Sequence, residues 1–155
     1  MTIVSGTAVT GAGFYNEGGS ALLTWEMVEG DPDRYFLTQI ATNTADTGAG
    51  FATGDGDLTL DGVWLYGNQA RLGGGGLHQG GVITVVNSIF DQNQASENGG
   101  GFYNAAITAT LAHNTFTATR PFQAAAFMMR PGPCWWKAAS LSPTRPLMAR
   151  RFLPK

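Results

Sequence analysis

The chain has 155 residues, a formal net charge of −2, 13% charged residues and 22 glycines. This length allows one domain with a hydrophobic core, and the near-neutral charge argues against nucleic acid as the main partner. The single cysteine, Cys134, excludes an internal disulfide framework.

Charge is distributed unevenly along the chain. All eleven acidic residues, from Glu17 to Glu97, precede residue 98, whereas seven of the nine basic residues lie in the last 36. This difference predicts two segments, a repeat region 1–119 and a tail 120–155. The N-terminus lacks the basic and apolar regions of a signal peptide, and no stretch approaches the ~20 apolar residues of a membrane-spanning helix. We therefore expect any export signal to lie outside this chain.

Three short motifs recur in chain order. The glycine-rich motif occurs at Gly11–Phe14, Gly48–Phe51, Gly74–Leu77 and Gly99–Phe102. An apolar residue with asparagine three positions later occurs at Ile40–Asn43, Leu65–Asn68 and Phe90–Asn93, with weaker copies at Ile3–Gly6 and Phe116–Thr119. Alternating apolar residues occur at Leu58–Leu60, Ile83–Val85 and Ala109–Leu111. The last copies of all three motifs are 25 or 26 residues apart, which indicates a structural repeat.

Each repeat has the pattern of short strands. Apolar and small polar residues alternate, and glycine or asparagine marks the sharp corners between the stretches. Three strands and three corners per repeat predict one coil of a right-handed parallel β-helix, in an all-β fold of four to five coils. Coils stacked at ~4.8 Å place equivalent side chains above one another. The predicted interior columns are Phe14, Phe51, Leu77 and Phe102 in one case and Ile40, Leu65, Phe90 and Phe116 in the other.

The first repeat contains an insertion. Phe14 and Ile40 are 26 residues apart, whereas Phe51 and Leu65 are 14 apart. Insertions leave a solenoid as loops, often on its binding face, so we place a candidate ligand site between residues 17 and 33. Its candidate contact residues are Trp25, Glu26, Glu29 and Asp31. An aromatic face beside carboxylates suits sugar rings or cationic side chains. In the alternative, Trp25 folds back over the solenoid and fills a gap.

The asparagines of the second motif need hydrogen-bond partners if they are buried, because an unpaired buried amide is costly. Asn43, Asn68 and Asn93 recur at one corner of consecutive coils, where each amide can donate to the oxygen of the next. We therefore predict an internal asparagine ladder, with exposed turn asparagines as the alternative. The glycine run 73–76 is interpreted as a corner rather than a phosphate cradle, because no Gly-Lys-Ser/Thr follows it.

No catalytic residue, metal site or cofactor is predicted, because the acidic residues do not align between repeats. Asp61 is aligned with Val86 and Ala112, and Asp91 is aligned with Tyr66 and Thr117. The segment 55–61 has some character of a calcium loop but lacks the spacing and the bidentate glutamate of an EF-hand.

The remaining candidate nucleophiles and metal ligands are isolated. His78 is aligned with Tyr15, Ala52 and Tyr103, and His113 with Gly62 and Asn87, so the two histidines do not share a site. Both are expected at the surface. Cys134 has no histidine beside it in the sequence.

The tail 120–155 differs from the repeats in composition. Proline, arginine and methionine replace glycine, and Trp135 and Trp136 are adjacent. One interpretation is a terminal cap, in which residues 123–129 form a helical turn over Phe116 and Leu111. The other, which the abrupt change in charge favours, is a shift of reading frame near residue 120. Met1 begins within a coil, so we expect the chain to be a fragment of a longer array.

The pairing of the glycine-rich motif with the asparagine motif resembles the repeats of chlamydial polymorphic outer membrane proteins. It equally resembles the β-helix repeats of other bacterial secreted and surface-anchored proteins. The segment Phe90–Asn93 matches the second motif fully, whereas Ile40 and Leu65 replace its phenylalanine. The resemblance covers residues 1–119.

This resemblance implies an extracellular or outer-membrane location and a non-catalytic role in adhesion or passenger display. Glycans or the surface of a host or neighbouring cell are the implied partners, and no cofactor is implied. These are expectations from fold-level analogy. The alternative is a fragment of a carbohydrate-active β-helix of the pectate-lyase type, whose catalytic coils lie outside this chain.

Overall fold

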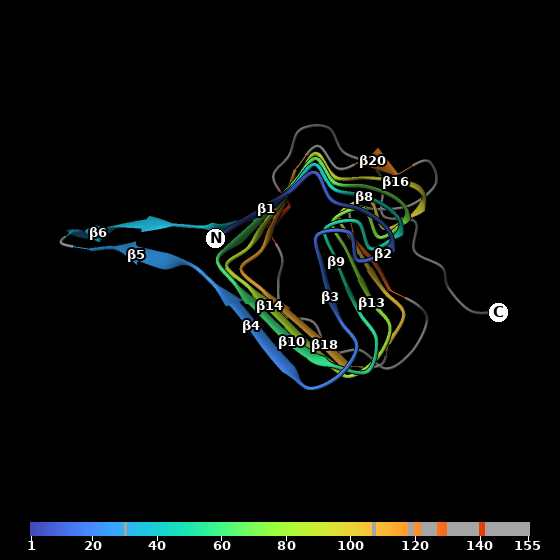
Figure 1. Ribbon diagram of the computed structural model, residues 1–155, viewed down its shortest axis with the longest axis horizontal. Coiled ribbons are helices and arrows are strands. Elements are labelled where there is room, and N and C mark those ends of the chain that lie inside the picture. Colours follow the sequence, from blue (N-terminus) through green and yellow to red (C-terminus); the bar gives the residue numbers. More distant parts are fainter. Residues whose placement is uncertain (30, 107, 118–119, 122–126, 130–139, 142–155) are drawn as a thin grey trace.

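The computed structural model describes residues 1–29, 31–106, 108–117, 120–121, 127–129 and 140–141. This part of the chain forms strands without a helix, and so without a helix that spans a membrane. Four parallel sheets run along a stack of coils, and a two-stranded antiparallel hairpin projects from its side (Figure 1). The chain is therefore an all-β parallel β-helix, as predicted.

The strands are grouped by sheet as follows. The first sheet contains β1 (Thr2–Val4), β7 (Thr38–Ala41), β11 (Val63–Tyr66), β15 (Ile89–Asp91), β19 (Thr115–Thr117) and β22 (Ser140–Leu141). The second contains β2 (Thr7–Thr10), β8 (Thr44–Thr47), β12 (Gln69–Leu72), β16 (Gln94–Asn98) and β20 (Arg120–Pro121). The third contains β3 (Phe14–Asn16), β9 (Phe51–Thr53), β13 (Gly76–His78), β17 (Phe102–Asn104) and β21 (Phe127–Met129). The fourth contains β4 (Ser20–Thr24), β10 (Asp57–Asp61), β14 (Val82–Val86) and β18 (Thr108–Ala112), and the hairpin consists of β5 (Glu26–Val28) and β6 (Asp31–Phe36).

Each complete coil contributes four strands, not the three that were predicted. The strand that the sequence does not reveal belongs to the second sheet, after the asparagine corner. Its copies, such as Thr44–Thr47 and Gln94–Asn98, consist mainly of small polar residues. Only a small inward residue, Ala45 or Ala95, is buried in each. These strands therefore lack the alternation of large apolar residues that identifies a strand in a sequence.

One interior column is confirmed in full. Ile3, Ile40, Leu65, Phe90 and Phe116 are paired in successive strands of the first sheet. The last two rings stack with their centroids 4.6 Å apart. A second column, which contains Leu58, Ile83 and Ala109, pairs as the repeat predicts in the fourth sheet.

The other predicted interior column is wrong at one residue. Phe14, Phe51 and Phe102 share a column, but their partner in β13 is Gly76, and Leu77 lies one position further on. A Cβ at Gly76 would overlap the Phe51 ring. Phe51 and Phe102 stack across this glycine with their centroids 5.8 Å apart. Leu77 is still buried, beside Ala52 in the neighbouring column.

The asparagine ladder is confirmed, because Asn43, Asn68 and Asn93 are completely buried. Asn43 Nδ2 donates to Asn68 Oδ1 at 2.9 Å, and Asn68 Nδ2 donates to Asn93 Oδ1 at 2.9 Å. Each oxygen also accepts a backbone N–H from the preceding coil, as Asn68 Oδ1 does from Asn43 at 3.0 Å. The ladder therefore fixes the corner between the first and second sheets through both side-chain and backbone groups.

His78 is buried, so its predicted place at the surface is wrong. It belongs to an interior column with Asn16, Thr53 and Asn104. His78 Nε2 lies 3.0 Å from the Thr108 carbonyl oxygen and Nδ1 lies 2.6 Å from the Thr53 hydroxyl. A carbonyl oxygen only accepts hydrogen bonds, so the ring nitrogen beside it, Nε2, carries the proton. In this neutral tautomer, Nδ1 accepts a hydrogen bond from the Thr53 hydroxyl. The register at Gly76 explains the error. Because Gly76, and not Leu77, pairs with Phe51 and Phe102, His78 lies one position further along the column pattern than the sequence alignment placed it. His113, by contrast, is exposed as predicted.

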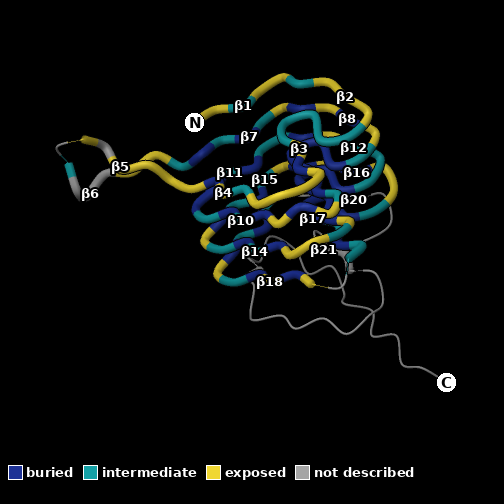
Figure 2. Tube along the Cα trace, turned by 60° about the horizontal axis from the view of Figure 1, so that its bottom comes forward, coloured by how far each residue is buried: buried dark blue, intermediate teal, exposed yellow. Residues whose placement is uncertain are grey.

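The insertion is the hairpin β5–β6, and it begins later than the predicted segment 17–33. Residues 20–24 form β4, which pairs in register with β10 of the next coil and buries Leu23. The inserted residues are 26–36, at the corner between the fourth and first sheets. The hairpin leaves the stack there and most of its described residues are exposed (Figure 2).

Three short strands of the tail continue the stack. Arg120, Phe127 and Ser140 pair in parallel with Gln94, Phe102 and Thr115. Residues 127–129 are therefore a strand, and the helical turn predicted over 123–129 is wrong there. The rest of the tail, including Cys134, Trp135 and Trp136, lies outside the described residues.

Candidate functional site

The hairpin leaves the solenoid at the corner between the fourth and first sheets, where a tryptophan, a glycine, an asparagine and a histidine occupy equivalent positions. Backbone hydrogen bonds align Trp25, Gly62, Asn87 and His113 at this corner in successive coils. The last three residues have φ between 50° and 65°, in the left-handed region. Trp25 extends over Gly62, whose Cβ, if present, would lie 2.8 Å from Trp25 Cδ1. Glycine at 62 therefore supplies both the turn and the room for the indole.

The hairpin brings a second aromatic ring to this corner. In the antiparallel pair β5–β6, Met27 faces Tyr35 and Glu26 faces Phe36, so the returning strand lies beside the residues that follow Trp25. The Trp25 and Tyr35 rings meet edge to face, with their centroids 5.9 Å apart and an interplanar angle of 67°. The tryptophan is 38% exposed and the tyrosine 63%.

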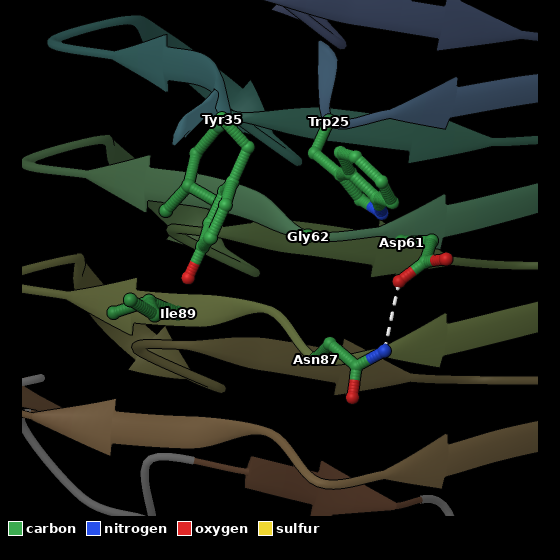
Figure 3. Close-up of a pocket in the computed structure, with 7 residues that line it drawn as sticks. Trp25, Tyr35, Asp61, Gly62, Asn87 and Ile89 are labelled. Atoms are coloured by element: carbon green, nitrogen blue, oxygen red, sulfur yellow. Dashed lines mark hydrogen bonds between the residues drawn. The ribbon is translucent and has the colours of Figure 1, made fainter. Parts of the chain in front are cut away.

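A pocket of about 350 Å³ lies between the base of the hairpin and the flank of the coils. Its lining consists of Trp25, Tyr35, Leu37, Asp61, Gly62, Asn87 and Ile89 (Figure 3). In the close-up, Tyr35 and Trp25 lie side by side, and Asp61, Asn87 and Ile89 lie on the coils beyond them. Three coils and the hairpin thus contribute to one hollow.

The polar side of the pocket is fixed by one hydrogen bond. Asn87 Nδ2 donates to Asp61 Oδ1 at 2.9 Å (Figure 3). A carboxylate accepts about four hydrogen bonds, so Asp61 keeps most of its capacity for a ligand. Among the side chains that the structure describes, no arginine or lysine forms an ion pair with Asp61.

Arg71, on the second sheet, forms ion pairs away from the pocket. Arg71 binds Asp46 at 2.9 Å and Glu97 at 2.8 Å, across three coils. These hydrogen bonds lower the pKa of Asp46 and raise that of Arg71. The three side chains are about half exposed, so solvent screens the ion pairs and each contributes little to stability.

The structure brings only one of the predicted ligand residues into the pocket. Trp25 lines it, but Glu26, Glu29 and Asp31 belong to the hairpin and are not among the lining residues. Trp25 also contacts Gly62 of the next coil, as the alternative interpretation expects. It therefore covers the flank of the next coil and also forms a wall of the hollow.

The sequence did not identify Tyr35, Asp61 and Asn87 as site residues. A signal for the last two was present, because Asn87 shares the repeat position of Gly62 and Asp61 precedes it. The sequence does not show where the insertion begins, so it did not align Trp25 with Gly62 and Asn87. Tyr35 had no signal, since only the hairpin pairing brings it back to the corner.

In the described part of the chain, no three His, Cys, Asp or Glu side chains are placed to hold a metal ion. Asp61 pairs with Val86 and Asp91 with Thr117, as predicted from the repeat, so these acids form no column. Asp57, in the segment with calcium-loop character, accepts a hydrogen bond from the Val82 backbone at 2.9 Å.

Comparison with known proteins gave no match. No family model matches the chain, and neither a curated protein nor a solved structure matches it. The fold assignment therefore depends on the repeat and on the parallel sheets themselves.

Proposed function

We propose that the chain is a non-catalytic scaffold that displays the hairpin β5–β6 and its side pocket. The observation that carries this proposal is the contrast between the coils and the hairpin. The coils use their buried polar side chains to bond one coil to the next, as Asn68 does with Asn93. The hairpin departs from the repeat and exposes Met27, Tyr35 and Phe36. Exposed aromatic and apolar groups on a rigid support are typical of recognition surfaces.

The sequence resemblance extends this proposal to a location and a role. The repeats resemble those of chlamydial polymorphic outer membrane proteins and of other bacterial surface or secreted β-helices. We therefore propose adhesion or passenger display outside the cell or at the outer membrane. Glycans or the surface of a host or neighbouring cell are the proposed partners. This step is an analogy between repeats, supported by the parallel β-helix fold.

The second candidate is a carbohydrate-active enzyme, which the carboxylate of Asp61 beside two aromatic rings favours. Most glycoside hydrolases use a pair of carboxylic acids on either side of the bond that is cleaved. Asp61 is the one acid among the lining residues of the pocket. We therefore place this candidate second.

A variant without the hairpin tests the display function. Residues 26–37 are deleted and Trp25 is replaced by glycine, so that Thr24-Gly-Thr38 has the length of the corner Asp61-Gly62-Val63. Residues 20–24 are retained because they form β4 and contain the buried Leu23. Val9→Thr is a matched control, since it removes an apolar side chain that is 77% exposed on the coil.

We expect the variant to stay folded and to lose the binding of the full chain to a glycan array or to cultured animal cells. The control keeps its binding. Binding that survives in a folded variant would exclude the hairpin as the displayed surface. Incubation with polygalacturonate and related glycans tests the enzyme candidate, and measurable release of sugar products would overturn the non-catalytic proposal.

A further inference from the structure

We propose that the side pocket binds an alkylammonium cation, such as a quaternary ammonium group or the side chain of a lysine. This inference adds a ligand class to the display function. It depends on that function only in that the hairpin is the exposed surface. It follows from the rings, the carboxylate and the charge of the coils.

Two aromatic rings line the pocket, and the face of an aromatic ring attracts a cation. A cation is attracted to the face of an aromatic ring when it lies within about 6 Å of the ring centre. Trp25 and Tyr35 are inclined at 67°, with their centroids 5.9 Å apart. They therefore form two walls of a partial cage in which one small cation can contact both residues. Leu37 and Ile89 add apolar surface that suits the methyl or methylene groups of an alkylammonium ion.

The carboxylate of Asp61 supplies the charge. Its described hydrogen bond comes from the neutral amide of Asn87, at 2.9 Å. This bond holds the carboxylate in place without neutralising it. A partly desolvated carboxylate attracts a cation more strongly than one in bulk water.

The charge of the surrounding region acts in the same direction. The residues before 120 include eleven acids and two arginines, and one of these, Arg71, pairs with Asp46 and Glu97. The summed field of such a region raises the local concentration of cations and lowers that of anions. An anionic ligand is therefore disfavoured at this pocket.

A neutral sugar fits the pocket less well than a cation does. The hydroxyls of a sugar need hydrogen-bond partners, and each one left unpaired on binding is costly. The polar side-chain groups of the pocket are those of Asp61 and Asn87, the hydroxyl of Tyr35 and the indole N–H of Trp25, and the first two are already bonded to each other. An alkylammonium ion needs few directional partners, because rings and one carboxylate satisfy it.

The test measures binding of choline by the full chain. The indole N–H signals of the four tryptophans are recorded by NMR, and that of Trp25 is assigned with a Trp25→Phe variant. The neutral isostere 3,3-dimethyl-1-butanol has the same shape as choline without its charge. Choline is expected to shift the Trp25 signal and to bind about tenfold more tightly than the isostere, with weaker binding at high salt.

Two variants and one control locate the site. Asp61→Asn removes the charge and keeps the shape, and we expect it to weaken choline binding about fivefold. Tyr35→Leu keeps an exposed apolar side chain and removes the ring, with an effect of about the same size. Asp55→Asn removes an exposed acid outside the pocket and is expected to leave affinity within about twofold. Circular dichroism confirms that each variant is folded.

Further probes distinguish the source of the cation and the alternatives. Nα-acetyl-lysine amide and its Nζ-trimethyl form both keep a charged side chain and represent a partner polypeptide. Choline represents a free small molecule. Equal binding of the isostere, or no shift of Trp25 with any of these cations, would overturn the proposal. So would a shift of Trp25 by methyl glucosides alone, which would make the pocket a sugar site. None of these results affects the hairpin-deletion test.

Discussion

At the scale of single residues, the solenoid is held together by polar side chains that repeat at buried positions. Asn68 is the clearest case, because its amide makes hydrogen bonds in both directions along the stack. Its Nδ2 donates to Asn93 Oδ1 and to the Ile40 carbonyl oxygen, both at 2.9 Å. Its Oδ1 accepts from Asn43. A buried amide with all its partners specifies which coil lies above which.

Replacement of Asn68 by alanine is therefore expected to be strongly destabilising. It leaves several buried donors and acceptors without partners, each at a cost of about 1–3 kcal/mol, and we expect a total loss of about 3–5 kcal/mol. The free energy of unfolding is measured by urea denaturation. Gln69→Ala, an exposed neighbour, is the control and is expected to change stability by less than about 0.5 kcal/mol. A loss for Asn68→Ala no larger than the control's would contradict the ladder.

His78 makes stability depend on pH. Burial lowers the pKa of His78, against the opposing effects of the Thr108 carbonyl and of Asp57. The folded state therefore binds fewer protons than the unfolded state at mildly acidic pH. The contribution of the neutral histidine is fully present above the unfolded pKa of about 6.5 and decreases as pH falls toward the lower folded pKa.

Urea denaturation between pH 7.5 and pH 5 measures this effect. The wild-type chain is expected to lose stability over that range. His78→Asn, which places in the column the residue found at Asn16 and Asn104, is expected to lose less. His113→Asn is the control, because His113 is exposed at a corner with φ of 56° that asparagine tolerates. If the pH dependence of stability is unchanged in His78→Asn, it arises from groups other than His78.

At the scale of elements, the register of the third sheet depends on a glycine. Gly76 in β13 lies between Phe51 of β9 and Phe102 of β17, and the space it leaves is filled by the Phe51 ring. The strand therefore joins its neighbours in the one register that places a glycine against the rings. A shift by one residue would bring the Leu77 side chain into the same space.

Gly76→Ala tests this register. The new methyl group overlaps the Phe51 ring, and we expect a loss of about 1–3 kcal/mol from the forced repacking. Gly18→Ala is a matched control, because nothing lies within 4 Å of a Cβ built there. Equal stability of the two variants in urea would show that the rings do not occupy the space above Gly76.

At the scale of the whole molecule, strands of the tail lie against the last full coils of the stack. The strands β16, β17 and β19 of the last full coils are paired on their outer edges by β20, β21 and β22. If these edges were left unpaired, they would promote association between molecules, and solenoids cover such edges with terminal caps. The described tail strands have the position of such a cap.

A chain that ends at residue 119 tests the role of the tail. If the tail strands cover the edge, the truncated protein has a lower midpoint in urea and associates in size-exclusion chromatography. Under the reading-frame hypothesis the tail does not pack. An unchanged midpoint, together with rapid proteolysis of 120–155 in the full chain, would support that hypothesis instead. Glu97→Gln in the full chain controls for a small change on the surface.

The sequence alone determined the repeat and most of what depends on equal spacing. Coils of 25 or 26 residues place Ile40, Leu65 and Phe90 above one another, because strand pairing between coils repeats every coil length. The same spacing predicted the asparagine ladder. It also predicted that Asp61 and Asp91 have no acidic neighbours in their columns.

Only the tertiary structure decided the details that depend on local geometry. A run of four glycines carries no side chain to mark its register, so the position of Gly76, and with it the burial of His78, followed from packing against Phe51. The segment Ser20–Thr24 has little likeness to its partner Asp57–Asp61, so only their pairing placed the insertion after Trp25. The pocket combines Trp25, Tyr35 and Asn87 from separate turns of the chain. Such a site depends on how a hairpin folds back, which repeat spacing does not encode.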